Sequence, residues 1–292
     1  MKLSEIQPRH WSKPLAAAAL AALLAGPVLA RDETLAIPPA QLTYADLVDL
    51  ADSSKMVVTA QIRKTRPLAP EQSPGLRQGW VRLLVEADTQ ALVSGKAPIG
   101  QALRFLADFK LDANGKPPRL KKTSLILFAL PVAGHPGDLQ LVDVDSYVLA
   151  EPEIGQRVRD VLTQLAAPDG PPAVTGVRDA LAVAGNLSGE SETQIFLKTA
   201  NDAPVSLNVV RRPNMDPEWG VSWSELVDQS AQPPQKDTLQ WYRLACFLPR
   251  QLPPGAILSG SGSDKMLAST DYRYVLDQLG SCARTRGGPP KF

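Results

Sequence analysis

Proline occurs so often along this chain that long uninterrupted helices are not expected. The sequence contains 27 prolines in 292 residues, well above the roughly 5% share of an average protein. A proline inside a helix removes one backbone hydrogen bond, and its ring clashes with the preceding turn. Because 44% of the residues are apolar, the chain can still bury a core. We therefore expect a globular protein of short elements, arranged as one large domain or two small ones.

The first half of the chain carries the pattern of an antiparallel β structure. Thr43 is expected to cap a short helix from Tyr44 to about Asp52. Along 104–112 the residues of one face are apolar with a period of two, as in a strand with one buried side. Further strands are predicted at 56–62, 80–87, 124–130 and 139–148. Strands joined by turn residues in this way predict a small antiparallel barrel, closed or nearly closed.

The order of these segments over residues 53–150 resembles that of the small OB-like barrels that are common among exported modules. The resemblance implies an OB-like β-barrel module over residues 44–152. Residues 31–43 would then form an extended leader in front of this module.

A helix and a linker are predicted to separate the barrel from a second module. Pro152 opens an amphipathic helix, and a proline- and glycine-rich stretch follows it, so 153–172 is interpreted as helix and linker. Residues 173–292 are predicted to form an α+β module with one disulfide, so the fold class is β-rich α+β. Its antiparallel strands are expected at 180–187, 193–199, 205–211 and 221–227.

Two helical segments are expected near the C-terminus. Asp271 is predicted to cap a final helix that ends at Gly280. Residues 238–248 fit a helix capped by Asp237 and a strand almost equally well, so both interpretations stay open.

The N-terminus has the three parts of a secretory signal peptide. Basic residues precede an apolar run over 15–24, and small residues then predict cleavage between Ala30 and Arg31. The run is about half as long as the roughly 20 residues that a membrane span needs. We therefore expect residues 1–30 to be removed, no membrane span in the mature chain, and a periplasmic or secreted location.

The only cysteines of the chain are Cys246 and Cys282. In an oxidising compartment, two such residues most simply form one disulfide. Two buried free thiols are the alternative.

A serine hydrolase would need a histidine within reach of a serine. Outside the predicted signal peptide the only histidine is His135, in a turn rich in Gly and Pro. The candidate nucleophiles are Ser188, Ser191 and Ser261, which lie in two stretches rich in small polar residues. Neither stretch matches the Gly-x-Ser-x-Gly motif of a nucleophile elbow. Loop serines are therefore expected, and a periplasmic serine hydrolase with His135 as base is kept as the alternative.

Other chemistries lack the residues that they need. One histidine and a paired set of cysteines leave no zinc ligand set, and 112–115 repeats only part of a calcium loop. No Gly-rich phosphate loop follows a predicted strand. Lys and Arg number 31 against 30 Asp and Glu, so no basic field exists for nucleic acid. We expect no metal, no cofactor and no nucleic-acid partner.

Aromatic residues make up only 5% of the chain, yet Trp219, Trp223, Trp241 and Tyr242 fall close together in the sequence. When exposed, such side chains grip a peptide or stack on a sugar. Strand spacing would instead place Trp219 and Trp223 on one buried face. We expect most of the four to be core residues, with one exposed, and name all four as candidates for ligand binding.

These patterns favour an exported, non-catalytic envelope protein that binds a protein or glycan partner. The small number of catalytic residue types disfavours an enzyme. The sequence specifies neither the ligand nor the oligomeric state.

Overall fold

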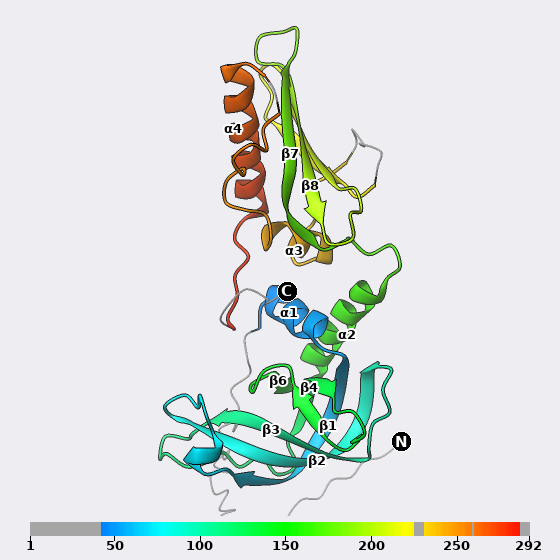
Figure 1. Cartoon of the computed structure of the whole chain (residues 1–292), viewed down its shortest axis with the longest axis vertical. Helices are drawn as coiled ribbons and strands as arrows, with labels where there is room; N and C mark the ends of the chain where they lie inside the picture. The colour runs from blue at the N-terminus through cyan, green and yellow to red at the C-terminus, as the bar shows by residue number, and fades with distance from the viewer. Residues whose placement is uncertain (1–41, 225–230, 259, 287–292) are drawn as a thin grey trace, which may run out of the picture. The chain divides into compact units, whose positions relative to one another are not determined.

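The computed structural model describes residues 42–224, 231–258 and 260–286 of the chain (Figure 1). By its contacts, every described residue belongs to one compact unit. The predicted signal peptide, its cleavage site at Ala30 and Arg31, and most of the predicted leader lie outside the described residues. Within the described ranges, each helix is too short or too polar to cross a membrane.

An antiparallel sheet of six strands follows a short N-terminal helix, α1. Thr43 caps this helix as expected, because its hydroxyl accepts from the Asp46 N–H while the Asp46 carboxylate accepts from the Thr43 N–H. The strand order is β3-β2-β1-β4-β5, and β6 also pairs with β4. The elements are α1 (Tyr44–Ser53), β1 (Met56–Pro67), the 3-10 helix η1 (Pro70–Gln72), β2 (Trp80–Gly95), β3 (Ala102–Lys110), β4 (Ser124–Pro131), β5 (Leu139–Leu141) and β6 (Tyr147–Leu149).

The strands are antiparallel as predicted, but the sheet is not closed into a barrel. β3 and β5 stand at opposite ends of the strand order and share no ladder, although an isolated bridge between Arg104 and Asp138 connects β3 to the residue before β5. The barrel does not close because residues 139–148, which the sequence predicts to be one strand, do not stay extended. The chain turns there, with the Ser146 N–H donating to the Asp143 carbonyl at 2.9 Å. The two short strands that result, β5 and β6, both pair with β4 instead of completing a ladder to β3.

The alternation predicted for 104–112 is confirmed in β3. Phe105, Ala107 and Phe109 are each at most 3% exposed and pack with apolar side chains of β1, β2 and β4. β1 and β2 extend beyond their predicted ends because they pair with each other along most of their length.

A second antiparallel sheet and a long helix form the other half of the described chain (Figure 1). The strand order is β10-β9-β8-β7. The elements are α2 (Pro152–Ala166), β7 (Val174–Ala184), β8 (Ser191–Thr199), β9 (Ser206–Arg211), β10 (Glu218–Ser222), α3 (Leu239–Ala245) and α4 (Gly262–Leu279). α4 packs on one face of this sheet, where its Asp271 accepts hydrogen bonds from Thr193 of β8 and Arg211 of β9. The β-rich α+β fold class is therefore confirmed.

Four details of this half differ from the prediction. β7 runs from Val174 to Ala184, whereas the strand was expected at 180–187. α4 begins at Gly262, capped by Ser261, whereas Asp271 is a buried residue inside the helix and caps nothing. Residues 238–248, for which a helix and a strand were both possible, contain the helix α3. Its cap is Thr238 instead of Asp237. The strand expected at 221–227 ends at Ser222, and residues 225–227 lie outside the described part of the chain.

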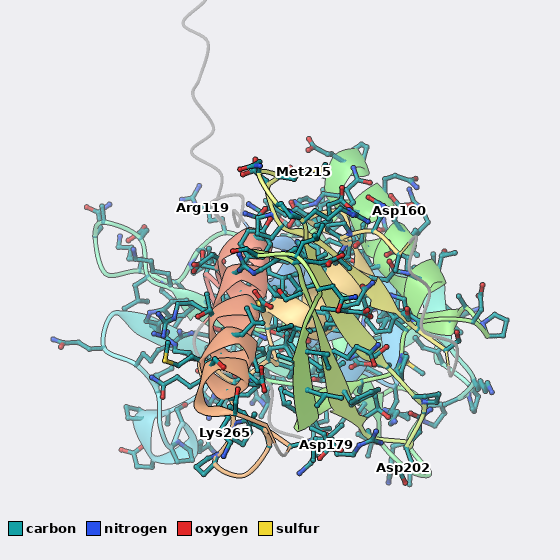
Figure 2. All side chains as sticks on the ribbon, turned by 90° about the horizontal axis from the view of Figure 1, so that it is seen from above. Arg119, Asp160, Asp179, Asp202, Met215 and Lys265 are labelled. Atoms are coloured by element: carbon teal, nitrogen blue, oxygen red, sulfur yellow. A yellow bond between two sulfur atoms is a disulfide. The ribbon has the colours of Figure 1, made fainter. Side chains whose placement is uncertain are left out.

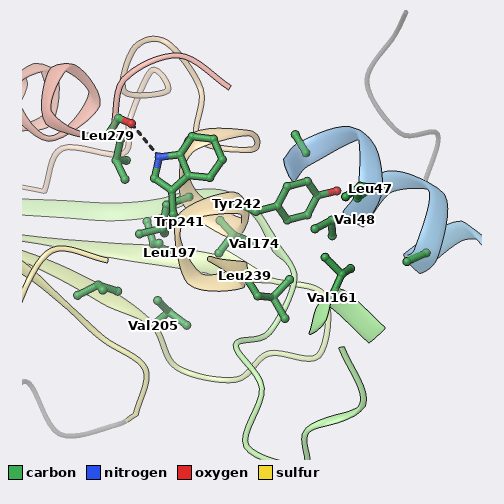
Figure 3. Packing of buried hydrophobic residues seen from close by; sticks show 14 of the residues in the cluster. Leu47, Val48, Val161, Val174, Leu197, Val205, Leu239, Trp241, Tyr242 and Leu279 are labelled. Atoms are coloured by element: carbon green, nitrogen blue, oxygen red, sulfur yellow. Dashed lines mark hydrogen bonds between the residues drawn. The ribbon is translucent and has the colours of Figure 1, made fainter. Parts of the chain in front are cut away.

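The buried apolar side chains form two clusters. The smaller cluster lies inside the first sheet. The larger cluster joins residues on both sides of the predicted linker, including Leu47 and Val48 of α1, Val161 of α2, and Val174 and Leu197 of the second sheet (Figure 3). The linker at 153–172 therefore separates two sheets that share part of one core.

The predicted disulfide between Cys246 and Cys282 is confirmed, with a Cα–Cα distance of 5.1 Å. Cys246 ends α3, and Cys282 follows α4, so the bond ties the ends of these two helices together. It also anchors residues 281–286, which we call the C-terminal strap.

Candidate functional site

The structure does not join the predicted histidine and serines into a catalytic group. His135 is exposed in the turn between β4 and β5. Ser188 is exposed in the turn between β7 and β8, Ser191 is the buried first residue of β8, and Ser261 caps α4. Among the described residues, no hydrogen bond connects the His135 imidazole to these serines, and the Ser261 hydroxyl donates to Asp264 of its own helix at 2.7 Å.

Three of the four predicted aromatic ligand residues are buried. Trp219, Trp241 and Tyr242 are 6%, 4% and 0% exposed, whereas Trp223 is partly exposed. The Trp241 indole donates to the Leu279 carbonyl at 2.8 Å, and the Tyr242 ring points toward α1 (Figure 3). The Tyr242 hydroxyl there donates to Asp49 at 2.6 Å. Trp241 and Tyr242 thus connect α3 to the end of α4 and to α1, and three of the four side chains are core residues.

Trp241 also reaches a cleft of about 550 Å³. The cleft is lined by the start of α1, by α2, by the segment leading into α3 and by the C-terminal strap. Its volume falls in the range of roughly 300–1,000 Å³ that is typical of small-ligand sites.

Apolar side chains and one satisfied amide form part of the cleft lining. Leu47, Val161 and Trp241 line the cleft with buried apolar side chains, and the partly exposed Tyr44 ring and the exposed Ala283 add accessible apolar surface. The Gln164 side-chain carbonyl accepts from the Tyr44 hydroxyl and from the Leu239 N–H, both at 3.1 Å. α1, α2 and α3 are thereby linked through one side chain.

Tyr44 stays protonated well into the alkaline range. Burial, followed by the negative charge of Asp237, raises the pKa of the Tyr44 phenol to about 12. At neutral pH the hydroxyl is therefore a neutral donor, which it uses for Gln164.

Charged groups of both signs stand on two walls of the cleft. On α2, Arg157 and Asp160 are three residues apart, a spacing that places both on one side of a helix. On the other wall, Lys236 and Asp237 are neighbours just before α3. Arg157 donates to the Leu42 carbonyl at 2.9 Å. Within the described chain, Lys236 and Asp237 make no side-chain hydrogen bond or ion pair.

The C-terminal strap contributes a third wall through Ser281 and Ala283. It is held in place by three consecutive residues that bind acidic groups of the first half. Arg284 pairs with Asp49 at 2.6 Å, the Thr285 hydroxyl donates to Asp46 at 2.6 Å, and Arg286 pairs with Asp145. Burial alone would raise the pKa of Asp46, but the hydrogen bonds from Thr285, Arg286 and Thr43 outweigh it and lower that pKa below its ordinary value.

The part of the chain that the structure covers contains no group of three or more His, Cys, Asp or Glu side chains that could hold a metal ion. Compared with the known protein families and with curated proteins, the chain matches none of them. The cleft must therefore be interpreted from its own geometry.

Most residues of the cleft were not identified from the sequence. Of the predicted candidates only Trp241 lines it. Tyr44, Arg157, Asp160 and Lys236 are ordinary helix or loop residues in the sequence, and no local motif marks them. They become a site only because segments as far apart in the sequence as Thr43 and Ala283, 240 positions, meet in the fold.

Proposed function

We propose that this chain is an exported, non-catalytic binding protein of the cell envelope and that its partner enters the cleft between α1, α2 and α3. The cleft is the observation that carries the proposal, because it combines a ligand-sized volume, an apolar lining and charged groups of both signs, of which Lys236 and Asp237 make no side-chain hydrogen bond or ion pair within the described residues. The disulfide supports export, since such bonds persist in oxidising compartments. The N-terminal pattern of residues 1–30 supports it independently.

A site-specific crosslink tests where the partner binds. A photoreactive amino acid replaces Lys236, an exposed residue of the cleft wall, in the full chain produced in its own cells. The matched control carries the same group in place of Lys265, which is exposed on α4 (Figure 2). We expect an adduct from position 236 and none from position 265. Mass spectrometry then shows whether the adduct contains a protein or a glycan, and the absence of an adduct from position 236, or equal adducts from both positions, contradicts the proposal.

The serine hydrolase alternative is tested by a fluorophosphonate probe, which labels activated serines. No contact in the described chain favours this alternative, because His135 has no hydrogen bond to a candidate serine. We expect no labelling of the wild type or of His135→Ala. Labelling that disappears in the variant would replace the binding proposal with the hydrolase.

A further inference from the structure

Beyond its role as a binding site, the cleft has a charge pattern that suits one class of ligand. We propose that the cleft binds a short peptide with free ends, through its ammonium and its carboxylate together. This inference rests on the proposed function, since it assigns the chemistry of the same site.

Each of two cleft walls carries one cation and one carboxylate. Arg157 and Asp160 belong to α2, and Lys236 and Asp237 belong to the segment before α3. Among the described residues no ion pair crosses the cleft between these walls, although both signs are present on each. Asp160 accepts only from the Gln156 amide on its own helix, at 2.7 Å.

This arrangement discriminates between ligands by charge. A purely anionic ligand attracted by Lys236 would also meet the carboxylates of Asp160 and Asp237, and a purely cationic ligand would meet Arg157 and Lys236. Repulsion between like charges lowers the affinity of a binding site for a ligand of the wrong charge. A ligand with one ammonium and one carboxylate can satisfy groups of both signs, whereas a neutral glycan leaves them without a counter-charge.

The apolar lining agrees with a peptide more than with a small ion. The partly exposed Tyr44 ring and the exposed Ala283 present apolar surface next to the charged groups, over the buried side chains of Leu47, Val161 and Trp241. A peptide can bury a side chain against that surface while its ends reach the walls. The Tyr44 hydroxyl is already used by Gln164, so the polar contacts that remain for the ligand come mainly from the charged groups.

Peptides with blocked ends test the inference directly. A mixture of tripeptides is dialysed against the full mature protein, and bound peptides are counted by mass spectrometry. The same mixture is tested with acetylated N-termini, with amidated C-termini and with both ends blocked. We expect the free-ended peptides to be retained, each single block to weaken retention about tenfold, and the double block to abolish it, because hydrogen bonds to charged groups are the stronger kind.

Variants show whether the bound peptides occupy the cleft. Lys236→Ala and Asp160→Asn change exposed side chains and leave the core intact. Each is expected to weaken retention of free-ended peptides about tenfold, while Lys265→Ala on α4 leaves it unchanged (Figure 2). Equal retention of free and blocked peptides, no retention at all, or insensitivity to both cleft variants overturns the inference. A crosslink from position 236 to a glycan, with no peptide retained, would overturn only the inference and leave the proposed function standing.

Discussion

Asp271 is fully buried, although it lies in a helix on the outside of a sheet. Its carboxylate accepts from the Thr193 hydroxyl at 2.5 Å and from the Arg211 guanidinium at 2.6 Å. A buried carboxylate is stable only when its charge is compensated, and removing one partner of such a pair leaves the other without compensation. Asp271 therefore fixes α4 to β8 and β9 by charge as well as by packing.

We expect Asp271→Asn to lower the free energy of unfolding by about 3 kcal/mol, the lower end of the usual cost of breaking a buried ion pair. The lower end applies because the Arg211 side chain is 27% exposed and keeps some hydration. Urea unfolding measures the change. The matched control is Glu218→Gln, which neutralises the exposed partner of Arg212 and should cost less than about 1 kcal/mol. Equal losses in the two variants would show that the buried pair adds nothing.

Asp46 connects α1 to the C-terminal strap. It belongs to the capping box of α1 and also accepts from the Thr285 hydroxyl and the Arg286 N–H. These bonds lower the pKa of Asp46 in the folded state against the opposing effect of burial. The carboxylate therefore stabilises the fold above its ordinary pKa of 3.8, and this contribution is lost as the pH falls through the lower folded-state pKa.

We expect Asp46→Asn to be less stable than the wild type at pH 7 and to lose less stability between pH 5 and pH 2. Urea unfolding at several pH values gives both slopes. Asp169→Asn, an exposed residue in the turn after α2, is the control and should keep the wild-type slope. A steep acid slope that persists in Asp46→Asn would show that other carboxylates cause it.

At the scale of the element, the start of α4 could not be predicted from the spacing of apolar residues. Between Gly262 and Thr270 only Ala268 is buried, and Met266 is 72% exposed, so the first half of the helix has no apolar face. The readable signal was the capping box, in which Ser261 and Asp264 satisfy each other's N–H groups. Without an apolar face, the serine-rich stretch before Asp271 has the pattern of a loop, and the cap formed by Ser261 and Asp264 is the one local signal of a helix start there.

We expect Ser261→Ala to lower the free energy of unfolding by about 1 kcal/mol, because the cap of α4 is lost. Ser269→Ala, later in the same helix, is the matched control. Ser269 only donates to the Lys265 carbonyl, and alanine has the higher helix propensity, so this variant should gain a few tenths of a kcal/mol. Thermal unfolding followed by circular dichroism compares the two, and a loss of the same size in both would exclude a capping role.

Elements with a buried face were predictable, whereas contacts between distant segments were not. β3 and α2 each have apolar residues at regular spacing because one face of each element is buried. Both elements lie near their predicted bounds. The disulfide followed from the presence of only two cysteines in a chain predicted to be exported. Barrel closure depended on whether 139–148 would stay extended, and a short turn decided against it. The cleft depends on four segments meeting, which no local pattern encodes.

At the scale of the whole molecule, the larger core cluster and the strap couple the two sheets. The cluster contains Leu47 of α1 and Leu197 of β8, so apolar burial crosses the predicted linker. The strap adds charged contacts from Arg284 to Asp49 and from Arg286 to Asp145. Since the disulfide holds the strap at Cys282, a covalent bond in the second half helps to position groups that bind the first half.

This coupling predicts which elements are destabilised when the disulfide is lost. The bond spans 36 positions, for which the chain-entropy treatment gives about 4 kcal/mol of stabilisation. We expect Cys246→Ser/Cys282→Ser to lose about that much and to show faster amide hydrogen exchange in α1, α3 and the strap. β2 and β3 should exchange as in the wild type, because their buried side chains belong to the separate cluster of the first sheet.

Reduced wild-type protein is the control for the serine substitutions themselves. Faster exchange confined to the neighbours of the two cysteines would mean that the strap is held by its arginines alone, and equal acceleration in β2 and β3 would mean that the two clusters unfold as one.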